Sequence, residues 1–151
     1  MALTRARFLA LGGFLDIYKP FYSEDLDLCT RAWMRGWKTL FVPESRVTHA
    51  GAGTIKRLFP AQRVRTTRIR NRLVFLSLYA DGRRFFFSYL PWNFLRAITR
   101  LLRLDATMLA AFLQLAGMRP RLVVLRKRIR AEQPFRTLEQ ILDEIAATAE
   151  V

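Results

Sequence analysis

The sequence predicts an α/β segment of short strands and one helix, followed by a mostly helical, basic C-terminal region. Glycine and proline cut the first piece into short segments, whereas apolar residues at helical spacing dominate the rest. Charge also changes along the chain. Residues 1–55 hold seven basic and five acidic residues, residues 56–130 hold eighteen and two, and residues 131–151 hold one and five. We therefore divide the chain into a first piece, a basic amphipathic helical region and an acidic C-terminal helix with these bounds.

The first piece contains one clear helix. Ser23 is a typical N-cap, acidic residues fill the first turn, and Gly36 ends the helical pattern. Residues 38–42 predict a strand that Pro43 closes, and residues 47–49 predict a second short strand.

The basic region predicts three further helices. The first covers residues 62–79, and the second restarts after Pro91 and covers residues 92–104. Asp105 caps the third, which ends at Gly117.

The acidic end of the chain carries the clearest helix signal. Thr137 and Gln140 have the spacing of a capping box. Apolar residues then follow on one helical face, whereas the apolar run at 122–125 fits either a helix or a strand.

Composition limits the class of protein. With 151 residues, 52% hydrophobic and 25% charged, the chain suits one domain with a modest core and is not disordered. The net charge of +14 indicates an anionic partner. One cysteine excludes an internal disulfide framework and a cysteine-rich metal cluster, and it fits a reducing compartment. The longest uncharged stretches, 85–95 and 106–118, are shorter than the roughly 20 apolar residues that span a bilayer. We expect no spanning segment and no secretory signal.

Three carboxylates crowd the predicted helix start. At about 100° per residue, Asp25 lies on the apolar side of the helix, whereas Glu24 and Asp27 lie with Arg31. The Asp27–Arg31 pair at i, i+4 then contributes only about 0.2–0.5 kcal/mol. Asp25 lacks such a partner, so we expect it to stay ionised and to point into a cleft. The alternative is that these acids only stabilise the N-terminus of the helix.

A lone histidine and an arginine-rich helical face are further candidate binding features. His49 is either a core residue or, beside the following glycines, a metal or phosphate contact. Arg96, Arg100 and Arg103 share one helical face, and aromatic residues such as Trp92 lie nearby. This pattern is typical of a helix at an anionic membrane surface. The alternatives are arginines solvated beside a packed face, or a backbone-binding nucleic-acid module.

The ordered series of motifs over about residues 5–80 resembles the C-terminal half of the catalytic domain of family 2 glycosyltransferases. The series comprises Gly12-Gly13-Phe14, Glu24-Asp25-x-Asp27-Leu28, Arg31, Gly36, Pro43, His49 before glycine, and Arg70-Asn71. Leu15 departs from the family, which usually has Asp or Asn after the Phe, but Asp16 follows immediately.

The resemblance implies a GT-A-like fragment that uses a nucleotide-diphospho-sugar donor and inverts the anomeric carbon. By its match to the motif, Asp25 would be the general base and Glu24 would orient the acceptor, which is a glycan or a lipid-linked hydroxyl. His49 matches a position that in some members helps to hold the metal or the diphosphate. The leaving diphosphate would need Mg²⁺ or Mn²⁺.

The resemblance also implies a partial enzyme. The sequence has no Asp-x-Asp apart from Asp25–Asp27 at the helix start, so we expect a fragment that lacks the donor-binding half. We expect this fragment to bind the metal only together with that half and to have little activity alone. We expect a cytoplasmic, peripheral position at the inner face of the cell membrane. Nucleic acid is not an expected partner. The alternatives are a basic nucleic-acid-binding module and a noncatalytic membrane-docking remnant.

Overall fold

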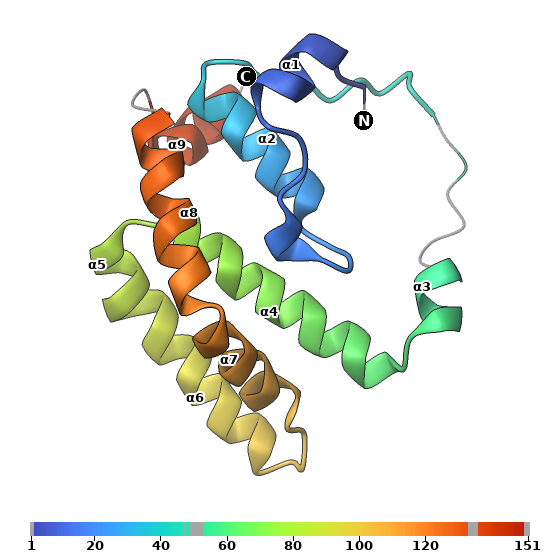
Figure 1. Cartoon of the computed structure of the whole chain (residues 1–151), viewed down its shortest axis with the longest axis vertical. Helices are drawn as coiled ribbons and strands as arrows, with labels where there is room; N and C mark the ends of the chain where they lie inside the picture. Colours follow the sequence, from blue (N-terminus) through green and yellow to red (C-terminus); the bar gives the residue numbers. More distant parts are fainter. Residues whose placement is uncertain (1, 47, 49–52, 133–135, 150–151) are drawn as a thin grey trace.

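A computed structural model describes residues 2–46, 48, 53–132 and 136–149. Every regular element within these ranges is a helix (Figure 1). The bounds are α1 Arg5–Ala10, η1 (3₁₀) Asp16–Tyr18, α2 Glu24–Met34, α3 Gly53–Leu58, α4 Ala61–Tyr79, α5 Gly82–Arg84, η2 (π) Phe85–Tyr89, α6 Leu90–Leu101, α7 Thr107–Gly117, α8 Arg119–Glu132 and α9 Leu138–Ala149.

The predicted α/β fold class, a GT-A-like fragment with short strands, is therefore wrong for the described residues. The strand expected at 38–42 is irregular, and its Phe41 side chain is 89% exposed. A strand needs a neighbour that completes its backbone hydrogen bonds, and no described segment pairs with this one. Residues 47 and 49 of the second expected strand lie outside the described residues.

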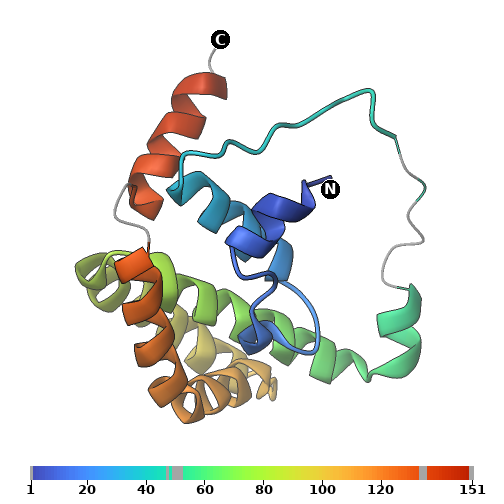
Figure 2. The ribbon, with the colours of Figure 1, turned by 45° about the horizontal axis from the view of Figure 1, so that its top comes forward.

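Helix α4 forms the centre of the fold, with α2 on one side and α6, α7 and α8 on the other (Figures 1 and 2). It covers almost the range that the sequence predicts. Its C-terminal half buries Val74 and Leu78 in the main core. The other buried members of this core are Tyr18, Trp33, Met34, Phe75, Tyr79, Leu122, Ile129, Leu138 and Ile141. The core thus joins α2, α4, α8 and α9, which lie far apart in sequence.

Helix α6 begins earlier than the sequence predicts. Pro91 was expected to separate two elements, yet α5, η2 and α6 run on without a break. Proline lacks an N–H and clashes with the carbonyl four residues before it in a regular helix. The π turn at Phe85–Tyr89 ends two residues before Pro91 and widens the helix over the turn that the proline ring meets, so the chain stays helical.

The last helices follow the sequence signals more closely. The Thr137 amide donates to Gln140 Oε1 (2.8 Å) and the Gln140 amide donates to Thr137 Oγ1 (3.3 Å), which confirms the capping box. The run at 122–125 belongs to α8. No single helix in the described residues is long and apolar enough to cross a membrane, and one pair, α7 and α8, bent by 66°, satisfies the criterion by length and composition only.

Candidate functional site

The candidate site lies where a loop at residues 12–23 leads into α2. Gly12 and Gly13 both have positive φ (75° and 69°), which glycine adopts without steric cost. Tyr22 and Ser23 also have a φ of 74°, which costs a non-glycine residue roughly 1–3 kcal/mol. Ser23 occupies the predicted N-cap position, although its side chain makes no capping hydrogen bond. Contacts from other elements must therefore hold this turn.

A buried carboxylate, Asp27, is the first of these contacts. Its side chain is fully buried and accepts hydrogen bonds from Tyr18 Oη (3.1 Å) and Tyr79 Oη (2.6 Å). Arg31 donates from Nε (2.8 Å) and forms an ion pair through Nη2 (2.6 Å). Asp27 thereby ties the loop, α2 and α4 together. The interpretation of Asp27–Arg31 as an i, i+4 pair of only about 0.2–0.5 kcal/mol is wrong, because both side chains are buried and helical spacing does not show that α4 covers this side of α2.

The same network fixes the start of the loop and the charge states around it. Arg31 also donates to the backbone carbonyls of Leu11 and of Gly13 (2.7 Å). Burial, and next the negative charge of Asp27, raise the pKa of Tyr18 and of Tyr79 above their usual range. Both phenols therefore stay protonated and act as hydrogen-bond donors to the carboxylate.

Asn71 and Arg70 of α4 hold the other end of the loop. Asn71 is fully buried, and its Nδ2 donates to the carbonyls of Tyr18 (2.7 Å), Phe21 (2.8 Å) and Tyr22 (2.8 Å). Arg70 Nη2 donates to the Lys19 carbonyl (2.5 Å). These bonds satisfy the carbonyls that the turn directs inward. They offset the cost of the left-handed residues just before α2.

The two candidate catalytic carboxylates follow this fixed turn. Asp25 is exposed, and its Oδ1 accepts from the Leu26 amide (2.8 Å). Glu24 is half-buried and lines a cavity of about 160 Å³ beneath the loop. Its Oε2 is buried with no hydrogen-bond partner in the described part of the chain. Glu24 therefore lines the cavity although its Oε2 is itself covered, whereas Asp25 is exposed to solvent.

Cys29, one turn along α2, lies near Asp25. Burial raises the pKa of the Cys29 thiol, and the charge of Asp25 raises it further. Such a thiol is a poor nucleophile at neutral pH. Cys29 is therefore not a candidate nucleophile at this helix start.

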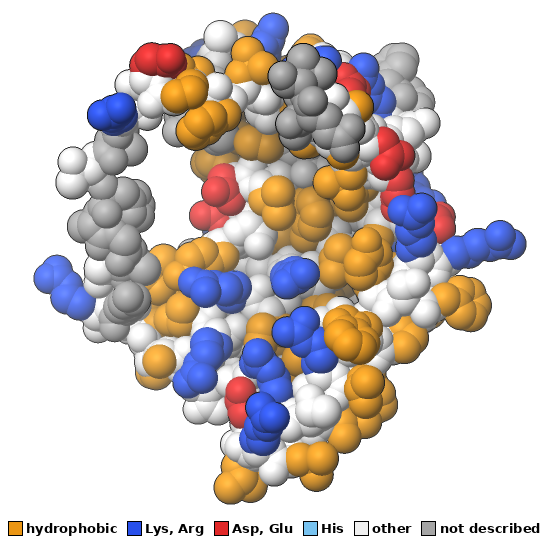
Figure 3. Space-filling view, turned by 180° about the vertical axis from the view of Figure 1, so that it is seen from behind, with side chains coloured by type: hydrophobic (Ala, Val, Ile, Leu, Met, Phe, Trp, Pro, Cys, Tyr) orange, Lys and Arg blue, Asp and Glu red, His pale blue; other side chains and the backbone are white. Residues whose placement is uncertain are grey.

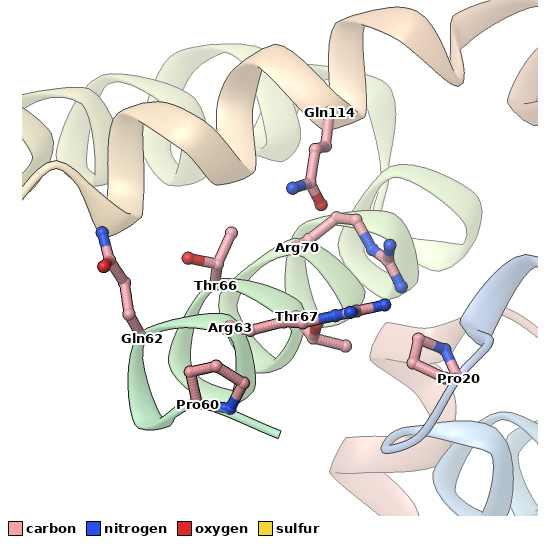
Figure 4. Close-up of a pocket in the computed structure, with 8 residues that line it drawn as sticks. All are labelled: Pro20, Pro60, Gln62, Arg63, Thr66, Thr67, Arg70 and Gln114. Carbon is pink, nitrogen blue, oxygen red and sulfur yellow. The ribbon is translucent and has the colours of Figure 1, made fainter. Parts of the chain in front are cut away.

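A basic pocket shares Pro20 as a lining residue with the Glu24 cavity. Its volume is about 490 Å³. Arg63 and Arg70 extend from α4 in the same direction, toward Pro20, and Gln114 of α7 points down at them (Figure 4). The almost fully buried Thr66 adds a hydroxyl to the wall. No acidic side chain is among the described residues that line it.

This pocket suits an anionic group. Burial lowers the pKa of Arg70, yet a guanidinium remains charged at any physiological pH. Arg70 already donates from Nε and Nη2 to Asn71 Oδ1 and from Nη2 to the Lys19 carbonyl, so it would attract a phosphate mainly through its positive charge, together with that of Arg63. Spacing alone did not identify the Arg63–Arg70 pair as a site, although the absence of acids from 56 to 72 was a signal for it.

His49 lies outside the described residues, so the structure does not place it relative to Asp25 or Glu24. No group of three or more His, Cys, Asp or Glu side chains that could hold a metal occurs in the described ranges. The described residues therefore do not by themselves form a site for Mg²⁺ or Mn²⁺, and we derive no step through a metal. The role of a divalent metal stays a prediction, as do the roles of Asp25, Glu24 and His49.

Comparison with known families identifies the class of protein. Residues 1–122 match the family described as glycosyl transferase family group 2. Because this match covers most of the chain, the protein belongs to glycosyltransferase family 2, as the motif series indicated. No curated protein and no solved structure matches the chain. Membership of this family indicates a glycosyltransferase-like enzyme.

Proposed function

We propose that this chain takes part in the transfer of a sugar from a nucleotide-diphospho-sugar to an acceptor hydroxyl. The observation that supports it best is the pair of carboxylates at the start of α2, of which Glu24 lines a cavity that shares Pro20 with the basic pocket. Asp25 is exposed, Glu24 lines a cavity, and the buried hydrogen bonds of Asp27 hold the first turn of α2 against Tyr18 and Tyr79. A family 2 enzyme needs an acceptor-side base and a place for the diphosphate.

In this proposal Asp25 takes the proton of the acceptor hydroxyl as its oxygen attacks the anomeric carbon. The new C–O bond forms while the bond from that carbon to the diphosphate oxygen breaks, which inverts the configuration. Glu24 orients the acceptor by accepting a hydrogen bond from a second hydroxyl group of that acceptor. Proton removal in the transition state by a positioned carboxylate contributes typically about 10²–10⁴-fold to the rate.

Arg63 and Arg70 then face the leaving group. The diphosphate gains negative charge as the glycosidic bond breaks, and fixed guanidinium groups stabilise that charge without reorganisation. Burial of Arg70 strengthens this effect because the surrounding water is reduced. We also propose that the acceptor is a glycan or lipid-linked hydroxyl and that the reaction occurs at the cytoplasmic face of a membrane.

The test measures sugar transfer from a panel of nucleotide-diphospho-sugars. The chain is fused to the donor-binding half of a family 2 glycosyltransferase, because its own sequence has no Asp-x-Asp outside α2. We expect Asp25→Asn to lower kcat by about 100-fold or more. Asp143→Asn, an exposed carboxylate on α9, is the matched control and should leave kcat unchanged. Transfer by Asp25→Asn at the control rate would exclude Asp25 as the base.

A further inference from the structure

The segment from α5 to the end of α6 exposes an unusually apolar surface. Phe87 is 82% exposed and Leu102, which caps α6, is 80% exposed. Phe94, Leu95 and Ile98 lie between them on the same side of the helix and are also exposed. We call these five side chains the outer apolar face. Monomeric soluble proteins rarely expose a large contiguous apolar patch, so this face indicates an interaction surface.

A different side of α6 is already used for packing. Ala97 is buried, and α6 lies along α7 in both ribbon views (Figures 1 and 2). Phe85, in the preceding π turn, is buried as well. The outer apolar face is therefore not a misplaced part of the core. It remains uncovered after α6 has satisfied its contacts with the described residues.

Arginine accompanies this face. Residues 82–104 contain five arginines and no acid. Arg96, Arg100 and Arg103 follow one another at i, i+4 and i+7, and the exposed Trp92 begins the same stripe. Figure 3 shows hydrophobic side chains along the lower right edge of the molecule, with Lys and Arg side chains gathered beside them. The helix thus has an apolar stripe and a separate basic stripe.

We propose that the outer apolar face docks on the surface of a bilayer that contains anionic lipid. This inference deepens the membrane-surface part of the proposed function and rests on it only for its biological purpose. A helix with aromatic and aliphatic residues on one side and arginines on another lies in the plane of an interface, with its apolar side in the acyl region. The basic stripe then lies within a Debye length of the headgroups and is attracted to them.

Charge favours lipid over a second copy of the chain. The protein carries a net charge of +14, and pairing two copies through this face would bring two acid-free segments together. Arg100 has one nearby carboxylate, Asp105, at 3.5 Å, and the other arginines of the stripe have no ion pair within the described residues. An anionic bilayer supplies both the apolar environment and the missing negative charge.

The test is sedimentation of the whole chain with vesicles at fixed low salt. Vesicles of phosphatidylcholine alone are compared with vesicles that include phosphatidylglycerol. We expect binding to the anionic vesicles and at least about tenfold weaker binding by Phe94→Ser/Ile98→Ser, because two large apolar side chains leave the interface. Leu40→Ser/Phe41→Ser removes two equally large, exposed side chains elsewhere and should bind as the unmodified chain does.

A second variant tests the contribution of the basic stripe. Arg96→Gln/Arg103→Gln should lose most of the preference for phosphatidylglycerol, whereas Arg5→Gln/Arg46→Gln should keep it. Equal binding by the Phe94/Ile98 variant and its control would overturn the proposal. A dimer in analytical ultracentrifugation that Phe94→Ser/Ile98→Ser abolishes, without vesicle binding, would assign the face to a second copy instead. Because no sugar transfer is measured, Asp25→Asn should still bind vesicles, which separates this result from the catalytic proposal.

Discussion

Replacement of Asp27 by Asn tests whether the turn before α2 depends on a buried charge. The variant keeps the shape of the side chain but leaves Arg31, which is 3% exposed, without its counter-ion. It also turns one acceptor oxygen into an amide donor facing the hydroxyls of Tyr18 and Tyr79. Breaking a buried pair from one side typically costs about 3–5 kcal/mol, because an uncompensated charge remains.

Urea unfolding followed by circular dichroism measures this loss. With a denaturant slope of about 2 kcal/mol/M, a loss of this size lowers the midpoint by about 1.5–2.5 M. Asp16→Asn breaks the exposed Lys19–Asp16 pair (2.9 Å) and should cost at most about 1 kcal/mol. The double variant Asp27→Asn/Arg31→Met should recover part of the stability, since it removes the stranded charge.

If Asp27→Asn loses no more stability than Asp16→Asn, then Asp27 is not a buried counter-ion. If the Asp27→Asn/Arg31→Met variant is no more stable than Asp27→Asn, removing the arginine charge gains no more than is lost with its hydrogen bonds to the Leu11 and Gly13 carbonyls.

Asn71, the two buried phenols and the basic pocket each give a further prediction. Asn71→Ala should destabilise the chain by about 2–4 kcal/mol in urea titrations, because three carbonyls lose their shared donor, whereas Ser77→Ala, which removes one local bond, should cost less than about 1 kcal/mol. Tyr18 and Tyr79 have raised pKa values in the folded state, so stability should be unaffected below the unfolded tyrosine pKa of about 10 and should fall as pH rises above it; Tyr79→Phe should make that fall shallower. Arg63→Gln should weaken the binding of inorganic pyrophosphate, measured by calorimetry, by about tenfold, whereas Arg57→Gln on α3 should not.

Local signals in the sequence account for much of the helical content. The range of α4, the end of α7 at Gly117 and the capping box of α9 all depend on residues within a few positions of one another. Capping and helical periodicity are local effects, so sequence reasoning identifies them. The strand prediction at 38–42 is wrong because a strand depends on a partner segment, which the local sequence does not reveal.

At the candidate site, too, the sequence predicts some features correctly and misses others. The motif series was enough to assign the chain to family 2 and to select Glu24 and Asp25. The sequence suggested that Asp25 points into a cleft, whereas the structure leaves Asp25 exposed and gives the cavity to Glu24.

Composition and the order of its motifs determined that this chain is basic, largely helical after residue 55 and a member of a glycosyltransferase family. Only the tertiary structure decided that Asp27 is buried between Tyr18 and Tyr79, residues that lie 9 and 52 positions away. It also decided that Arg63 and Gln114 face one pocket and that one side of α6 stays uncovered. The physical reason is that burial and charge pairing depend on which elements pack together, and those contacts join residues with no local relation in the sequence.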